Sequence, residues 1–302
     1  IDEERISSSL LGAGLTITSI TRDEKDTGYK IFGGYQFEQF GVEALAFGLK
    51  SGQGSLKNGN AYEAGSLSQS GLGVAFGARI LPVRVLGKCG GFLSDVLDAM
   101  LWSAGLDVPG IPSNPTPADV INLSLGSPTT CSSFEQTVVD RVNAAGTLVV
   151  AAAGNSGGSV DSPANCNNVL SVGALDRDGS RASYSAIGSA ISLMAPGGFS
   201  NGLVGLGNSG TTTPTSASLV SKTGTSFAAP LVAATAGLMR AINPALTPAQ
   251  IRSQILANTA SFLSPRSSTC TVNQGSGSCN CTTAVCGAGM LDTFGAVTSA
   301  KG

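Results

Sequence analysis

The sequence predicts an α/β fold, a three-layer sandwich in which helices cover both faces of a mainly parallel central sheet. Short apolar, β-branched segments alternate with helical patterns along most of the chain, as is typical of parallel sheets flanked by helices. The chain has 302 residues, of which 42% are hydrophobic and only 12% charged, so it can bury a large core. Because no linker or internal repeat interrupts the pattern, we expect a single domain over residues 1–302.

The amino-terminal part, residues 1–72, is the least regular. Residues 15–20 alternate and are rich in β-branched side chains, which predicts a strand, and residues 30–37 resemble a second short strand. We expect a helix at residues 42–50. The Gly-, Ser- and Asn-rich stretch over residues 51–73 predicts a loop.

From residue 73 to residue 302 the alternation is regular. Apolar, β-branched segments predict strands at residues 79–86, 120–125, 147–153, 169–174 and 191–194. The remaining patterns predict helices at residues 94–105, 132–145, 225–242, 247–257 and 290–299. The segment at 147–153 is nearly all apolar, as in a strand buried on both faces. Ser94 is expected as the N-cap of its helix, and the Thr247-Pro248 pair as a helix start.

The charge pattern excludes several classes of partner. The net charge is −2 and Lys and Arg form no run, which argues against binding to nucleic acid or to anionic membranes. The longest apolar stretch, residues 227–239, is too short to span a bilayer and contains a proline. We therefore expect a monomer with no nucleic-acid or membrane partner.

The seven cysteines are unevenly placed. Three lie in the body and four crowd the tail at residues 261–286: Cys89, Cys131, Cys166, Cys270, Cys279, Cys281 and Cys286. A zinc site is the alternative for the tail, but the chain has no histidine and the setting is rich in Ser, Gly and Thr, which favours disulfides. This usage indicates an oxidising compartment with one cysteine left over. The four tail cysteines allow three pairings.

Ser226 stands where a loop turns into an apolar helix. Residues 223–230 read Thr-Gly-Thr-Ser-Phe-Ala-Ala-Pro. A helix start presents unpaired N–H groups and partial positive charge, which suits a hydroxyl nucleophile or a developing oxyanion. The alternative is that Ser226 merely caps the helix. Chemistry in such sheets gathers at the carboxyl ends of strands, where three glycine-punctuated segments lie, at residues 124–126, 153–155 and 195–198.

Several ordered motifs resemble one family. They occupy residues 73–91, 120–126, 151–156, 183–185 with 195–198, 224–230 and 286–289. Residues 224–230 differ from that family's Gly-Thr-Ser-Met-Ala-Ala-Pro only in having Phe for Met. The chain from about residue 73 to its end is thereby similar to the subtilisin-like serine proteases, the subtilases (peptidase S8), in their secreted bacterial branch. The resemblance implies a subtilisin-like sandwich and a secreted or periplasmic protein.

The resemblance also implies roles for individual residues. Ser226 takes the position of the nucleophile and Asn155 that of the oxyanion-hole donor. Six residues would flank a bound peptide: Gly90, Gly91, Ser124, Leu125, Gly126 and Gly154. The alternatives are a turn-stabilising Asn155 and ordinary sheet packing for the others.

Cysteine and metal roles follow from the same resemblance. Cys131 and Cys166 resemble the mid-domain disulfide of the branch. Cys89 is expected as a free thiol, because its usual partner falls in the amino-terminal part, which has no cysteine. Structural calcium is common in the family, but no Asp-rich loop with calcium spacing occurs, so neither a metal ligand nor a cofactor is assigned.

The sequence departs from the family at the catalytic base. The family's Gly-His-Gly-Thr-His-Val-Ala-Gly has its nearest counterpart at residues 41–48, where Val42 and Leu45 stand at the two histidine positions. Asp26, in Asp-Thr-Gly, has the letters of the catalytic aspartate, but residues 21–25 separate it from the preceding strand, and a solvated loop charge is the alternative.

A serine hydroxyl needs a neighbouring base to accept its proton. The leading hypothesis is therefore a subtilase-fold pseudoprotease, inactive or strongly impaired, that retains peptide binding in the old cleft. One alternative is an active serine endopeptidase that uses Glu43 or Lys222 as a substitute base. Another is an interaction or structural protein that acts through a different surface.

Overall fold

The structure is a computed structural model of the chain. It describes residues 20–22, 29–31, 45–50, 74–75, 78–87, 90–198, 202–208, 217–272 and 274–301. The expected strand at 15–20 (apart from Ile20), the strand over 32–37 and the loop at 51–73 lie outside these residues.

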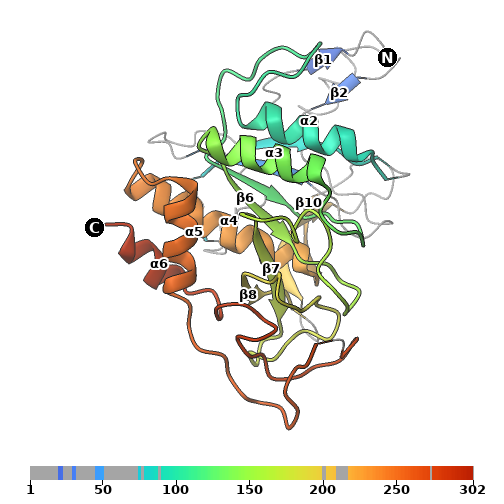
Figure 1. Ribbon diagram of the computed structural model, residues 1–302, viewed down its shortest axis with the longest axis vertical. Coiled ribbons are helices and arrows are strands. Elements are labelled where there is room, and N and C mark those ends of the chain that lie inside the picture. Colours follow the sequence, from blue (N-terminus) through green and yellow to red (C-terminus); the bar gives the residue numbers. More distant parts are fainter. Residues whose placement is uncertain are drawn as a thin grey trace.

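Among the described residues, six strands form the central sheet, in the order β4-β3-β5-β6-β7-β8. Of these, β6, β7 and β8 are labelled in Figure 1. Their bounds are Leu45–Lys50 (β3), Arg79–Arg84 (β4), Val120–Leu123 (β5), Leu148–Ala152 (β6), Leu170–Leu175 (β7) and Leu193–Pro196 (β8). The last four run parallel, whereas β3 is antiparallel to both of its neighbours. The strands predicted from residue 79 to residue 194 are confirmed, with their ends shifted by one or two residues.

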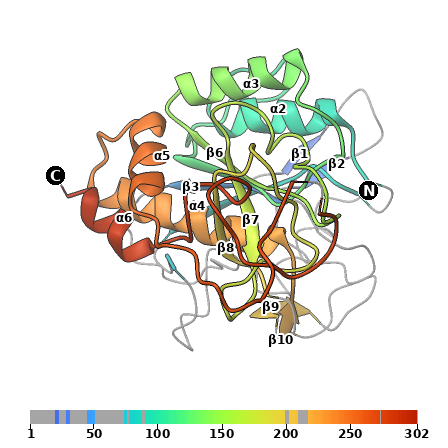
Figure 2. The ribbon, with the colours of Figure 1, turned by 60° about the horizontal axis from the view of Figure 1, so that its bottom comes forward.

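Helices cover both faces of this sheet, which confirms the three-layer fold. Figure 2 shows α2 (Leu93–Ser103) and α3 (Ser133–Ala144) on one side. On the other side lie α4 (Thr225–Ile242), α5 (Pro248–Ala257) and α6 (Thr293–Ser299).

The strands are apolar on both faces because both faces are covered. In β5, Ile121 packs into the cluster that contains α2 and α3, and Val120 packs into the cluster that contains α4. Val149 and Val150 of β6 divide in the same way. Period-2 alternation thus separates two cores across one sheet.

The central helix α4 packs against β5, β6, β7 and β8. By length and composition it could cross a membrane, but 61% of its 18-residue span is buried inside the fold, as expected of a core helix. Small residues such as Ala228, Ala229 and Ala233 face the sheet and are almost fully buried, so helix and sheet approach closely.

The helix expected at residues 42–50 is wrong. Residues Leu45–Lys50 form β3, inserted between β4 and β5. The large apolar residues Leu45, Phe47 and Leu49 recur with period 2, and Gly48 disfavours a helix, so the strand pattern prevails.

Two other helix starts also differ from expectation. α2 begins at Leu93 with Phe92 as N-cap, without a side-chain capping bond, so Ser94 lies within the first turn and is not the cap. α6 begins at Thr293, where the Asp292 side chain accepts from the Gly295 N–H, and so is three residues shorter than expected. The start of α5 is confirmed, with Thr247 as N-cap and Pro248 in the first turn.

In the described part of the chain, two small antiparallel pairs lie outside the central sheet. β1 (Ile20–Arg22) pairs with β2 (Tyr29–Ile31), and β9 (Leu203–Asn208) pairs with β10 (Ala217–Lys222). The sequence pattern does not predict the β9–β10 pair, because Gly and Ser interrupt the apolar residues of its strands. β10 leads directly into α4.

Candidate functional site

The ends of β5 and β6 meet the start of α4 at one edge of the sheet. β5 is followed by Ser124, Leu125 and Gly126, and β6 by Gly154 and Asn155. Parallel strands bring their carboxyl ends to the same edge. The structure thus brings together these segments and Ser226, as the sequence predicts.

Ser226 lies in the first turn of α4 and is only 7% exposed. Its Oγ donates to the carbonyl oxygen of Ser124 at 3.4 Å. In return, the Ser124 Oγ donates to the Ser226 carbonyl at 2.7 Å, while accepting from the Asn122 amide at 2.9 Å. These contacts fix β5 to the helix start.

Ser226 does not cap the helix. The N-cap residue is Gly224, with φ 149°, a conformation that residues with a β-carbon rarely adopt. The alternative interpretation of Ser226 as a helix cap is therefore wrong.

Asn155 is held by the residue that precedes Ser226. Its Oδ1 accepts from both the backbone N–H and the hydroxyl of Thr225, each at 2.9 Å. A backbone N–H can only donate, so this end of the amide is the oxygen. The Nδ2 end faces Gly224, where an added β-carbon would lie 3.6 Å from it. The amide N–H groups are thereby directed to the start of α4.

Tyr184 helps to hold the backbone before α4 through the segment at residues 197–198. Its hydroxyl donates to the carbonyl of Gly197 at 2.8 Å and also contacts that of Gly198, while the Gly197 carbonyl accepts from the Gly224 N–H at 3.0 Å. Burial raises the pKa of Tyr184 to about 12, so the phenol stays neutral and remains a donor. The sequence motifs at 183–185 and 195–198 indicated these segments, but not this contact.

Asp161 is a site residue that sequence reasoning missed. β-Carbons built at Gly126 and Gly154 would lie 3.0 Å from the Asp161 Cβ and 2.4 Å from its Oδ2, respectively. Burial raises the pKa of the Asp161 carboxyl. One signal was available in the sequence, since Asp161 is the only Asp, Glu, Lys or Arg between Arg141 and Asp176.

Gly90 and Gly91 lie in the connection from β4 to α2. Gly87 and Gly90 exchange backbone hydrogen bonds, and a β-carbon at Gly91 would lie 2.2 Å from the Val85 carbonyl, so no larger residue fits there. Both glycines line a cavity of about 290 Å³ together with Trp102 and other residues of β4 and α2.

The structure describes only some of the residues considered for the catalytic aspartate, the lost histidine and the substitute base. Asp26, Val42 and Glu43 lie outside the described residues, as does Cys89. Lys222 is the last residue of β10, four positions before Ser226. In the part of the chain that the structure describes, the hydrogen-bond partner of the Ser226 Oγ is a carbonyl oxygen.

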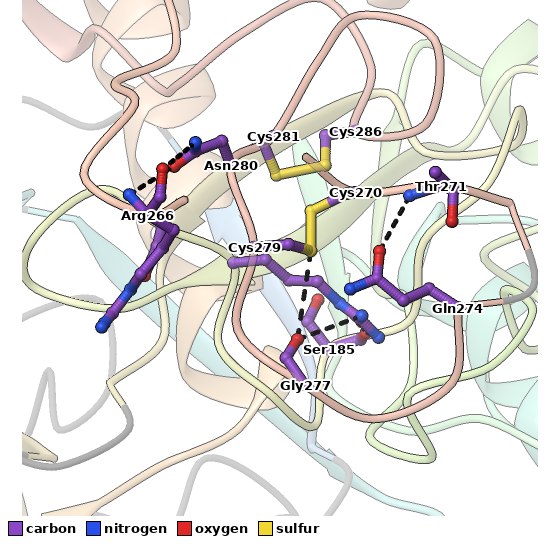
Figure 3. Close-up of a disulfide and its surroundings, with 12 residues drawn as sticks. Ser185, Arg266, Cys270, Thr271, Gln274, Gly277, Cys279, Asn280, Cys281 and Cys286 are labelled. Atoms are coloured by element: carbon purple, nitrogen blue, oxygen red, sulfur yellow. Dashed lines mark hydrogen bonds between the residues drawn. A yellow bond between two sulfur atoms is a disulfide. The ribbon is translucent and has the colours of Figure 1, made fainter. Parts of the chain in front are cut away.

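The disulfide predictions are confirmed where they can be compared. Cys131 pairs with Cys166, and the tail forms the pairs Cys270–Cys279 and Cys281–Cys286, which selects one of the three possible pairings. Figure 3 shows the two tail disulfides side by side. The sulfur atoms of Cys270, Cys281 and Cys286 lie within 4.8 Å of one another, and in this structure all are used in disulfides.

The tail supports the Asn155 loop through Arg181, which is fully buried. Its guanidinium donates to the carbonyls of Ser185 at 2.6 Å, Gly157 at 2.8 Å and Gly277 at 3.2 Å. Gly277 and Ser185 lie beside the Cys270–Cys279 disulfide (Figure 3). Burial lowers the pKa of the Arg181 guanidinium, while the three carbonyl oxygens accept hydrogen bonds from it in place of water.

Comparison with known proteins agrees with this architecture. The model of the Subtilase family of peptidases matches residues 51–295. An extracellular protease of Xanthomonas campestris pv. campestris is 45% identical over 231 residues, covering 76% of this chain and 37% of that protein. An extracellular basic protease of Dichelobacter nodosus is 42% identical, covering 63% and 32%. This chain thus spans about a third of the length of these relatives. A solved protease structure from Pseudoalteromonas arctica has a TM-score of 0.68 and 43% identity, covering 76% of this chain and 65% of that one.

Proposed function

The chain belongs to the subtilase family, and we propose that it binds extended peptide segments at the ends of β5 and β6 while hydrolysing them very slowly or not at all. It would thus be a pseudoprotease. The three disulfides and the extracellular relatives support secretion into an oxidising compartment.

One observation carries the proposed loss of activity. The 302 residues contain no histidine, and the described partner of the Ser226 Oγ is the carbonyl of Ser124. A carbonyl oxygen accepts a hydrogen bond but does not take the proton that an attacking hydroxyl must release. Without the base, catalysis falls to the roughly 10³–10⁴-fold over water that the oxyanion hole and binding supply, a figure measured on subtilisin itself.

The rest of the machinery supports peptide binding. β5 and β6 pair as far as Leu123 and Ala151. Beyond that point the two segments no longer pair with each other, and each hydrogen-bonds to residues 161–162 instead. Gly126 and Gly154 have no side chains to obstruct a peptide that adds to the strand ends. The Asn155 Nδ2 faces the helix start, where it can donate to a peptide carbonyl.

A second candidate is an active endopeptidase. It is favoured by the named relatives, which are proteases, and by the retained Ser226 and Asn155. Its base would be Glu43 or Lys222, and a carboxylate or amine serves in that role only with a suitably shifted pKa and hydrogen-bond geometry.

The test combines labelling, turnover and binding. We expect a fluorophosphonate probe to label Ser226 far below stoichiometry, and a denatured protein substrate to remain intact, with Ser226→Ala as the control. Stoichiometric labelling together with turnover, both lost in Ser226→Ala, would establish the active endopeptidase instead.

Peptide binding is tested separately. A β-carbon at Gly126 would lie 3.0 Å from the Asp161 Cβ, so Gly126→Val should obstruct the binding segment and abolish peptide binding. Ala75→Val, at a buried position away from the strand ends, controls for a general effect of added volume. If wild type binds no peptide, the protein acts through another surface.

A further inference from the structure

The cavity beside β4 and α2 is lined by both apolar and acidic side chains. Its volume of about 290 Å³ is close to the lower end of the range of small-molecule sites. Leu86, in the connection from β4 to α2, and Ile111, in the segment after α2, form part of its apolar wall. Among the described residues, neither Ser226 nor Asn155 lines it. The cavity is therefore a separate place from the ends of β5 and β6.

Asp95, Asp98 and Trp102 lie on one face of α2. They stand three and four residues apart, the spacing at which helix side chains are neighbours, and all three line the cavity. The Trp102 Nε1–H donates to the Pro112 carbonyl at 2.8 Å, which holds the indole in place. The helix thus supplies two carboxylates and one fixed aromatic ring to the same space.

These two carboxylates have no counter-charge in the described part of the chain. The ion pairs found there involve other acids, Asp119 and Asp178, and no hydrogen bond within that part reaches the carboxyl oxygens of Asp95 or Asp98. Both residues are half-buried. A carboxylate that is partly removed from water is stabilised by a hydrogen-bond donor or a cation.

Arg84 also lies on the wall, but it is directed elsewhere. Its side chain is exposed, and its Nε donates to the Leu86 carbonyl at 2.9 Å. Its Nη2 lies over Gly87, where an added β-carbon would be 4.0 Å away. With two acids and one base among the described lining residues, the wall has a net negative charge.

We propose that this cavity binds a small organic cation, a protonated amine attached to a single ring or a short hydrocarbon chain. The ammonium group would donate to the carboxylates of Asp95 and Asp98. The hydrocarbon part would lie against Trp102, Leu86 and Ile111, where apolar burial and cation–π attraction add to the affinity. This inference does not rest on the proposed peptide binding.

The test compares three ligands of similar size: 2-phenylethylammonium, the neutral 2-phenylethanol and the anion phenylacetate. Trp102 is the single tryptophan of the chain, so its fluorescence reports on the cavity wall, and calorimetry measures the same affinities independently. We expect 2-phenylethylammonium to change the emission saturably and to bind about 10-fold more tightly than the alcohol, as for a hydrogen bond to a charged group. Phenylacetate should bind most weakly, because it meets like charge.

The double variant Asp95→Asn, Asp98→Asn should bind the amine and the alcohol equally, while Asp107→Asn, at an exposed position outside the cavity, should retain the preference. Equal binding of the two ligands to wild type, or a preference that survives in the double variant, would overturn the proposal. So would calorimetric binding that leaves the Trp102 emission unchanged, since the amine would then bind elsewhere.

Absence of amine binding by both methods would also overturn the site, and it would leave the proposed peptide binding standing. If the double variant does not fold, the comparison of the three ligands on wild type decides.

Discussion

Asn155 and Thr225 lie 70 residues apart in the sequence and are joined by two hydrogen bonds of 2.9 Å, both to the Asn155 Oδ1. The Thr225 hydroxyl also accepts from the Gly154 N–H at 3.2 Å. One threonine side chain therefore connects the end of β6 to the residue before Ser226. The orientation of the Asn155 amide depends on this connection.

Thr225→Val should loosen this connection while keeping the shape of the side chain. The buried Gly154 N–H loses its acceptor, so we expect the free energy of unfolding to fall by about 1–3 kcal/mol in urea titrations. Thr223→Val, at a nearby exposed position, should leave stability within about 0.5 kcal/mol. Equal losses in the two variants would show that the Thr225 hydroxyl does not have this role.

Arg181→Met should uncouple the tail from the Asn155 loop. Three carbonyl oxygens lose their donor, so we expect a loss of about 3 kcal/mol or more in denaturant unfolding. Amide hydrogen exchange should rise together at residues 155–160 and 274–279. Arg177→Met, at an exposed position, is the matched control. Faster exchange at only one of the two segments would contradict the coupling.

Glu135 should make stability depend on pH. Burial opposes ionisation, but hydrogen bonds from Ser162 and Ser132 outweigh it and hold the pKa of the Glu135 carboxyl below its ordinary value of 4.5. A lowered pKa stabilises the fold above about pH 4.5, and this contribution is lost as the pH falls through the folded-state value.

Ser162→Ala should therefore destabilise the protein by about 1–3 kcal/mol at pH 7, because a carboxylate loses a hydroxyl donor. The difference from wild type should shrink in urea titrations carried out below pH 4. Ser133→Ala, at an exposed position at the start of α3, should show no such trend. A difference that stays constant with pH would mean that Ser162 does not stabilise the ionised carboxyl.

The layers of the fold follow from short-range patterns, which is why the sequence predicts them. Residues 148–153 are apolar throughout, and the small residues of α4 allow it to pack closely against the parallel strands of the sheet. The helix predicted at residues 42–50 is wrong because Leu45, Phe47 and Leu49 alternate with period 2, and pairing with β4 and β5 stabilises the strand.

The residues of the site likewise fall into those that a local motif predicts and those that depend on contacts distant in the sequence. Ser226, Asn155 and Gly154 are found by their local motifs, and the structure brings them together. Asp161 and Arg181 act through contacts with segments distant in the sequence, Gly126 for the first and Gly277 for the second. No local pattern specifies such contacts, so a lone charge among small residues was the only sign of Asp161.

The antiparallel strand β3 changes how the chain can be divided. Composition and motif content shift near residue 73, yet in the described structure β4 hydrogen-bonds to β3 alone, and β3 also covers the free side of β5. A fragment beginning at residue 73 would lack β3, so β4 and β5 would each expose an unpaired edge. Unpaired strand edges promote aggregation between molecules. The irregular first segment thus supplies an internal strand of the sheet, and recombinant versions that omit it should self-associate.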